Sequence, residues 1–199
     1  MAILLPTSVI NSVYNNVAIG FPILKSLRKA VPKAFLDCHL MVTDPEKWVE
    51  PLKKAGGDQM LFHYEAKVKS FESLIKKIKD TGMKAGLVLS PDTPLDSKVM
   101  DIIEKNPLDM LLIMTVVPGF GGQSFIGKSY YLNLEHTMEK VRKARKAFPN
   151  LKIEVDGGIN KSNMHIPIKA GANVIVSGTG LYGEKDPKSI IQQMKELGK

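Results

Sequence analysis

The sequence predicts an α/β protein built as a TIM-type (β/α) barrel, and three observations predict it. Short β-rich runs alternate with amphipathic segments, these runs are almost continuously apolar, and polar residues gather where they end. Nearly continuous apolar strands are typical of a parallel sheet covered by helices. In a barrel the carboxyl ends of all strands meet at one mouth, where the active site lies. We expect one barrel domain over residues 1–199.

Seven segments are expected to form strands, because each is a short apolar or β-branched run bounded by turn residues. An open doubly wound sheet would show the same alternation of strands and helices. The barrel is favoured because polar residues end so many strands and because no G-x-G-x-x-G motif follows an early strand. The expected strands are residues 2–5, 34–42, 59–63, 84–89, 110–116, 152–155 and 173–177.

The segments between these strands are expected to be helices. Asp44 and Pro45 resemble a helix start, and Gly56 with Gly57 resembles a helix end. Over 70–80, apolar residues recur on one face and lysines lie opposite them. Further helices are expected over residues 19–30, 95–104, 133–148, 161–170 and 185–197.

The charge and composition of the chain limit the classes of function. The formal net charge is +8, but the lysines are spread along helical faces that we expect to be solvated. The densest basic run, residues 139–146, has no interleaved aromatic residues, so no nucleic-acid partner is expected. A basic field also favours small phosphorylated anions. No apolar stretch approaches the 18 residues that a membrane span requires, so no membrane partner is expected either.

The cysteine content and the N-terminal sequence indicate a cytoplasmic protein. Cys38 is the single cysteine, which excludes an internal disulfide and suits a reducing compartment. It has no evident activating partner, so nucleophilic catalysis by Cys38 is not expected. The first residues lack the basic region of a signal peptide.

Three glycine-bearing loops follow the expected strands over 110–116, 152–155 and 173–177. A lone glycine loop is more often a turn than a ligand site. Three of them on adjacent strand ends favour an anion site, because backbone amides can approach a phosphate where no Cβ intervenes. The glycines of these loops are Gly119, Gly121, Gly122, Gly157, Gly158 and Gly178.

Asp156 and His39 are the expected chemical groups at the mouth. Asp156 ends a strand, where it could be a turn-forming residue, a general acid/base or a metal ligand. A histidine such as His39 beside apolar residues is more often a core residue, yet His39 and Asp156 together suit part of a His/carboxylate metal site. His63 is expected to have a structural or supporting role.

With these motifs the sequence closely resembles the ribulose-phosphate 3-epimerase family. The resemblance runs from about Val13 to the C-terminus, with a shorter match at residues 8–12. It implies a (β/α) barrel that binds a divalent cation (zinc, iron(II) or manganese) and inverts C3 of a phosphorylated pentulose. The matching motifs are LDCHLMV (36–42), FHYEA (62–66), MTVVPGFGGQSF (114–125), IEVDGGI (153–159) and GANVIVSGT (171–179).

The resemblance also assigns roles to residues of this chain. Asp156 would be one of two acid/base groups on opposite faces of the substrate and also a metal ligand, and His39 would be a second ligand. Ser8 would contact the substrate. The wall on the phosphate side would consist of Gly119, Phe120, Gly121, Gly122, Gly157, Gly158, Gly178 and Thr179.

The sequence departs from the family in a missing segment, at Val117, where the family usually has glutamate, and in an insertion near residues 127–134. In family members, Ser-x-x-Asn-Ser is followed by a helix and by a strand that carries a second histidine ligand and the second catalytic aspartate. Here residues 8–12 run directly into residues 13–22, which match the sequence after that strand. The resemblance therefore implies seven strands in place of eight, two metal ligands and one proton-transfer group.

Two functions follow from this departure. The first is a D-ribulose 5-phosphate 3-epimerase of the pentose phosphate pathway, which interconverts D-ribulose 5-phosphate and D-xylulose 5-phosphate with strongly reduced activity or none. The alternative is a non-catalytic phosphosugar-binding or regulatory paralogue. The edge left by a missing strand could pair with a second copy, giving a homo-oligomer.

Overall fold

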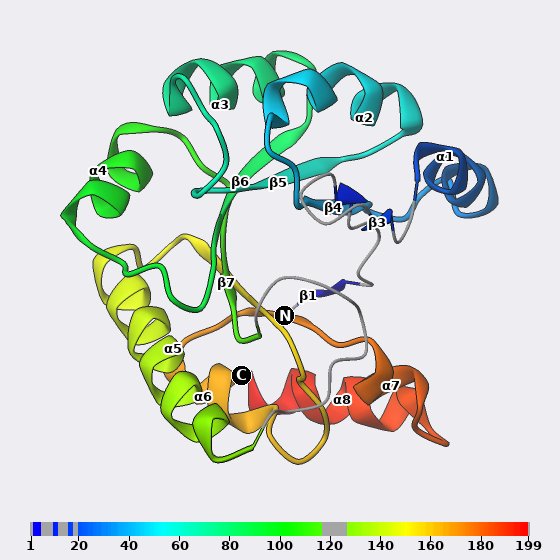
Figure 1. Ribbon diagram of the computed structural model, residues 1–199. Helices are drawn as coiled ribbons and strands as arrows, with labels where there is room; N and C mark the ends of the chain where they lie inside the picture. The colour runs from blue at the N-terminus through cyan, green and yellow to red at the C-terminus, as the bar shows by residue number, and fades with distance from the viewer. Residues whose placement is uncertain (1, 5–9, 12–15, 18–19, 117–126, 199) are drawn as a thin grey trace. The chain divides into compact units, whose positions relative to one another are not determined.

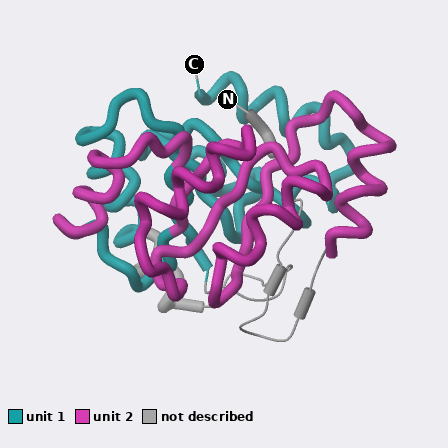
Figure 2. Tube along the Cα trace, turned by 90° about the horizontal axis from the view of Figure 1, so that it is seen from above, with its two compact units in different colours: residues 1–5, 89–95, 111–199 teal, residues 6–88, 96–110 magenta. Residues whose placement is uncertain are grey.

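The computed structural model describes all residues except 1, 5–9, 12–15, 18–19, 117–126 and 199. The chain forms two compact units (Figure 2). Unit 1 contains residues 1–5, 89–95 and 111–199, and unit 2 contains residues 6–88 and 96–110. In each unit parallel strands alternate with helices along the chain (Figure 1).

Unit 2 holds the strands β4 and β5 and most of β6, which pair in parallel in that order. Their bounds are Asp37–Leu40, Gln59–His63 and Lys84–Leu89. The pair β2 (Ile10–Asn11) and β3 (Asn16–Val17) is antiparallel. The helices are α1 (Phe21–Ala30), the 3₁₀ turn η1 (Pro45–Trp48), α2 (Val49–Ala55), α3 (Phe71–Asp80) and α4 (Ser97–Lys105).

Unit 1 holds β1 and β9, β8 and most of β7, which follow one another in that order in the sheet. Their bounds are Ala2–Leu4, Val174–Val176, Lys152–Asp156 and Met110–Met114. The helices are α5 (Gly127–Ala147), α6 (His165–Ala170), α7 (Thr179–Tyr182) and α8 (Pro187–Leu197).

All seven expected strands are present, and their centres are buried as a helix-covered parallel sheet requires. The helix expected after Asp44 begins as the 3₁₀ turn η1 and ends at Gly56, whose φ of 98° is left-handed. Three short elements, β2, β3 and α7, were not expected, because two to four residues show no periodicity. The parallel strands described thus number seven, as the resemblance implied.

The amino ends of the strands are fixed by one repeated device. The residue just before a strand uses its side chain to accept a hydrogen bond from the N–H near the start of the preceding strand. Asp58 accepts from Leu36 N (2.7 Å), Asp109 from Ala85 N (3.1 Å) and Asn173 from Ile153 N (2.8 Å). Polar side chains at this end of a (β/α) unit therefore serve stability.

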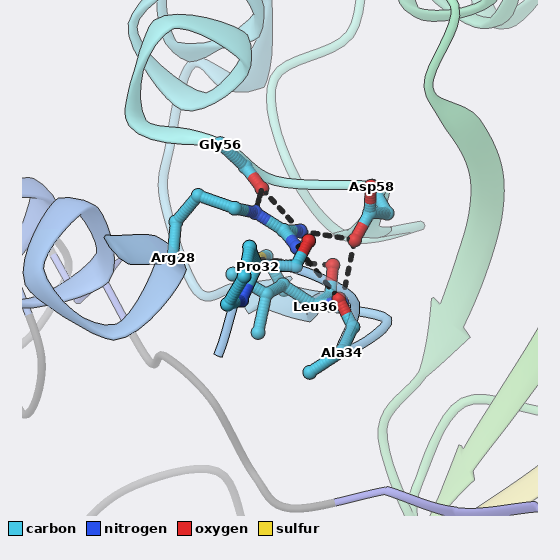
Figure 3. Close-up of polar contacts among 7 residues, drawn as sticks. Arg28, Pro32, Ala34, Leu36, Gly56 and Asp58 are labelled. Carbon is cyan, nitrogen blue, oxygen red and sulfur yellow. Dashed lines mark hydrogen bonds and ion pairs between the residues drawn. The ribbon is translucent and has the colours of Figure 1, made fainter. Parts of the chain in front are cut away.

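An arginine near the end of α1 joins the turn after α1 to the turn after α2 in unit 2 (Figure 3). Arg28 Nε and Nη2 donate to Gly56 O at 3.1 and 2.8 Å. Its Nη1 donates to Pro32 O (3.0 Å) and Ala34 O (2.7 Å), and its Nη2 forms an ion pair with Asp58. The planar guanidinium suits several fixed carbonyls at once.

Unit 1 contains the same arrangement around Arg145, near the end of α5. Its Nε donates to Gly171 O (2.9 Å), and its Nη1 donates to Pro149 O (2.7 Å) and Leu151 O (2.9 Å). Gly171 and Gly56 both adopt a left-handed φ and both lie against the arginine stem, where a Cβ would approach within 3 Å. The two arginines thus hold equivalent turns in the two units.

The basic run in α5 is only partly solvated. Val141 and Ala144 are fully buried, and Lys140 is buried too. Lys140 Nζ donates to the carbonyls of Ser90, Pro91 and Thr93 at 2.7 to 3.0 Å. Lys143 Nζ donates to Leu95 O at 2.6 Å, and Arg145 holds the turn described above, so three cations of this run bind backbone carbonyls.

Candidate functional site

Two histidines at the carboxyl-end side of β4 and β5 contact each other in unit 2. Their Nε2 atoms lie 2.8 Å apart, and the rings stack with centroids 4.9 Å apart and an interplanar angle of 24°. His39 and His63 each expose 8% of their surface. Because they come from neighbouring parallel strands whose side chains alternate, both point to the same face of the sheet.

A glutamate completes this cluster. Glu65 Oε2 lies 3.0 Å from His63 Nδ1, so the three side chains form a line from Glu65 through His63 to His39. His39 Nδ1, at the far end of the line, is buried and has no hydrogen-bond partner among the described residues. Burial lowers the pKa of His39 well below its usual value, and the charge of His63 lowers it further, although Glu65 opposes this.

Asp37 precedes His39 by two residues and lies on the same face of β4, one layer nearer the amino end of the strand. It is buried, and its Oδ2 accepts a hydrogen bond from Gln59 Nε2 at 3.0 Å. Gln59 is the register partner of Asp37 in β5. These contacts assign Asp37 to the interior layer of unit 2.

Asp156 ends β8 in unit 1 and is half-buried. Burial raises the pKa of its carboxyl to about 6. Thr115 N donates to the carbonyl of Asp156 at 2.8 Å, and Thr115 Oγ1 lies within hydrogen-bonding distance of the Asp156 and Gly157 carbonyls. Thr115 therefore fixes the backbone that carries the carboxylate, a role that the sequence did not indicate.

The glycine pair after Asp156 is required by the backbone. Gly157 has a φ of 125° and Gly158 a φ of 63°. A Cβ on Gly157 would lie 2.6 Å from Val116 Cγ2 and 2.7 Å from Thr115 Oγ1. Only glycine combines this φ with this close approach.

The loop after β9 is attached to the loop after β8. Ser177 Oγ donates to Ile159 O at 2.7 Å. Gly178 is the N-cap residue of the short helix α7, and Thr179 is its first residue. Since β8 and β9 are parallel neighbours, their two loops emerge at the same end of the sheet. The structure thus brings together four residues expected on the phosphate side, namely Gly157, Gly158, Gly178 and Thr179.

The remaining expected residues are distributed as follows. His39 belongs to unit 2 and Asp156 to unit 1, and each is described within its own unit. In the part of the chain that the structure describes, no three His, Cys, Asp or Glu residues form a group that could hold a metal ion. Outside the described residues lie Ser8, Gly119, Phe120, Gly121 and Gly122.

A pocket of about 750 Å³ lies on unit 2 beside the loops after β4 and β5. Its lining carries four lysines and two acids, and Lys47 and Lys77 pair with Asp44 and Glu46. His39 and His63 are not among its described lining residues. This pocket is therefore a solvated feature separate from the histidine cluster.

The model of the ribulose-phosphate 3 epimerase family matches residues 7–182 of this chain. A ribulose-phosphate 3-epimerase of Eremothecium gossypii is 46% identical over 192 residues, which cover 91% of this chain and 75% of that protein. The protein named ribulose-phosphate 3-epimerase, cytoplasmic isoform, of Oryza sativa subsp. japonica is 44% identical over 182 residues, with the same coverage.

Solved structures share the fold at low identity. The 3-hexulose-6-phosphate synthase of Salmonella typhimurium has a TM-score of 0.70 and 15% identity, and the match covers 100% of this chain and 98% of that chain. Phosphoribosyl anthranilate isomerase of Thermococcus kodakaraensis has a TM-score of 0.66 and 13% identity, with 97% and 87% covered. These enzymes are TIM barrels, so the predicted fold class is confirmed, with seven parallel strands described.

The family match and the fold agree with each other. The matched segment includes both the histidine cluster of unit 2 and the Asp156–Gly158 turn of unit 1. No helix among the described residues is long and apolar enough to cross a membrane. Identity above 40% over nine-tenths of the chain fixes the relationship: this chain belongs to the ribulose-phosphate 3 epimerase family.

Proposed function

We propose that this chain binds D-ribulose 5-phosphate and D-xylulose 5-phosphate and that Asp156 transfers the C3 proton on one face of the sugar. The observation that carries this proposal is the half-buried carboxyl of Asp156 with its pKa raised to about 6. A group that titrates near neutral pH can both accept and return a proton, which general acid/base catalysis requires. Its backbone is held by Thr115, so its position is fixed.

The loops beside Asp156 support a phosphate site. Gly157 and Gly158 have no side chain between the backbone and a ligand, and their positive φ values turn the chain sharply. Gly178 and Thr179 begin a helical turn, and the first N–H groups of a helix point out of its amino end. The resemblance adds Ser8, Gly119, Phe120, Gly121 and Gly122 to the substrate contacts.

The residues present fit a divalent cation in part. His39 offers a buried Nδ1 with no hydrogen-bond partner among the described residues, and Asp156 offers carboxylate oxygens; zinc, iron(II) and manganese accept such donors. A bound cation would supply Lewis-acid stabilisation of the negative charge that develops on the sugar oxygens. His39 belongs to unit 2 and Asp156 to unit 1, and no three ligand-type residues form a group among the described residues.

The missing segment limits the reaction. Inversion at C3 needs one proton-transfer group on each face of the sugar, and the family segment with the second aspartate has no counterpart in residues 8–22. Loss of one general acid/base typically lowers the rate by about 10²–10⁴-fold. We therefore expect Asp156 to exchange the C3 proton of one epimer with solvent much faster than the chain inverts that carbon.

The experiment is proton NMR of each epimer in D₂O with added zinc, which is diamagnetic and leaves the sugar signals sharp. Loss of the C3 proton signal of one epimer, with little conversion to the other, is the expected result. Asp156→Asn, which keeps the size of the side chain, should abolish the exchange. Exchange and inversion at equal rates would show that another residue serves as the second group.

A second candidate is a phosphosugar-binding protein without catalysis. It is favoured by the lack of a three-residue metal-ligating group among the described residues. Calorimetric titration with ribulose 5-phosphate distinguishes the two: binding without any C3 exchange in D₂O supports the second candidate. The first proposal also includes a single domain over residues 1–199, a cytoplasmic location and a place in the pentose phosphate pathway.

A further inference from the structure

We propose that the pocket on unit 2, beside the loops after β4 and β5, is a second anion site that takes a small, hydrophilic phosphate monoester. The site is independent of the proposed function, because its residues lie in unit 2 and the glycine-bearing loops proposed for the sugar phosphate lie in unit 1. The pocket has a volume of about 750 Å³, which is within the range of small-molecule sites.

The walls of the pocket are held together by contacts between three segments of unit 2. Lys67 N donates to Thr43 O at 2.8 Å, which joins the loop after β5 to the loop after β4. Glu46 in η1 pairs with Lys77 in α3, with 3.3 Å between Oε1 and Nζ. These contacts form without a ligand, so little conformational entropy is lost when one binds.

The charges of the lining leave two cations without a partner. The two acids of the lining, Asp44 and Glu46, each pair with a lysine of the same pocket. Lys67 and Lys69 also line the pocket, and the ammonium group of neither has an ion-pair or hydrogen-bond partner among the described residues. Four lysines and two acids give the described lining a net charge of +2.

The chemistry of the lining favours one class of ligand. A phosphate monoester carries a charge of about −1.5 to −2 at pH 7, which balances the charge of the lining. Its oxygens accept charge-assisted hydrogen bonds from ammonium groups. Among the described lining residues Val68 is the single apolar one, and none is aromatic. A sugar phosphate therefore suits the pocket better than a nucleotide, whose base would stack on an aromatic ring, or a lipid.

The test is a titration of ¹⁵N-labelled protein with glucose 6-phosphate at low ionic strength, followed through the backbone amide signals. We expect saturable shifts at Thr43 and residues 67–69, which weaken as salt is added because salt screens exposed charges. The amides of Gly157, Gly158 and Gly178 report separately on the proposed phosphate site of unit 1. Shifts at these glycines alone would overturn this inference and leave the proposed function intact.

A double variant tests the two unpaired cations. Lys67→Gln/Lys69→Gln removes both charges and should weaken binding by about tenfold or more, because hydrogen bonds to charged groups are the strong ones. Both side chains are exposed, so the variant should fold normally.

Lys25→Gln/Lys29→Gln is the matched control. These two exposed lysines of α1 are not among the described lining residues, and the variant loses the same two positive charges. Its affinity at Thr43 and residues 67–69 should equal that of the wild type. Equal weakening in both double variants would show that the anion responds only to the net charge of the chain, and this result would overturn the site.

Discussion

Asp156 shows how the position of one residue decides its chemistry. In water an aspartate is fully ionised at neutral pH, whereas the half-buried Asp156 has a pKa of about 6. The folded chain therefore binds this proton more tightly than the unfolded chain does. Between about pH 4 and pH 6 the contribution of Asp156 to stability falls as pH rises. Above pH 6 the carboxyl is ionised in both states, and the full cost of burying the charge lowers the stability of the folded chain.

Asp156→Asn tests this pH dependence. The variant lacks the titrating group, so its free energy of unfolding relative to wild type should increase from pH 4 to pH 7, by about 2–3 kcal/mol. Urea unfolding in the presence of EDTA at several pH values measures the difference. A difference that does not change with pH would contradict the raised pKa.

Gly157 is predicted to be far less replaceable than another glycine with positive φ. Gly157→Ala places a methyl group 2.6 Å from Val116 Cγ2 in a backbone region that L-residues avoid, so a loss of about 3 kcal/mol is expected. Gly82, with a φ of 80°, has only Lys53 Nζ at 3.7 Å from the same position. Gly82→Ala should cost about 1 kcal/mol. Denaturant midpoints of the two variants would be compared, and equal losses would contradict a steric role of Gly157.

At the scale of elements, two segments of the chain repeat one design. In each, a helix ends with an arginine that donates to at least three carbonyls. A strand follows, and a helix with a left-handed glycine cap leads to the next strand. His39 and Asp156 each follow their arginine, Arg28 or Arg145, by eleven residues. The two expected metal ligands therefore occupy equivalent positions in the α1–β4 and α5–β8 segments.

The repeat has one difference that allows a test. Asp58 and Asn173 occupy equivalent positions, but only Asp58 is charged, and it pairs with Arg28. Arg145 Nη2 is buried with no partner among the described residues, and burial lowers the pKa of Arg145. Asn173→Asp should keep the bond from Ile153 N and add a charged partner for Arg145.

We expect Asn173→Asp to stabilise the protein by about 1 kcal/mol, and the reciprocal Asp58→Asn to destabilise it by a similar amount. The exposed Lys29→Ala variant serves as the control, with a change within about 0.5 kcal/mol. Chemical unfolding at pH 7 measures all three. Destabilisation by Asn173→Asp would show that Arg145 cannot reach a carboxylate there.

For the whole molecule, the expected single domain predicts one cooperative unfolding transition. Asp58 lies in unit 2 and Asn173 in unit 1. In a single domain, Asp58→Asn should lower and Asn173→Asp should raise the temperature of the same calorimetric transition, by a few degrees. Two transitions, each shifted by only one of the variants, would show that the units unfold independently.

Much of this molecule follows from patterns that are local in the sequence. The strands over 59–63 and 84–89 have the predicted bounds, because a buried parallel strand is apolar on both faces. Asp156 was predicted at a strand end from the sequence IEVDGG alone. The antiparallel pair β2–β3 could not be predicted, because two-residue strands have no periodicity.

The sequence by itself determined the parallel α/β architecture, the family, and His39 and Asp156 as candidate groups. Only the tertiary structure decided that Lys140 is buried, that Arg28 and Arg145 hold equivalent turns, and that Glu65, His63 and His39 form one line. The physical reason is the range of the interactions. Periodicity and turn chemistry act between residues close in the sequence, whereas the protonation and partners of a buried group depend on atoms from distant segments.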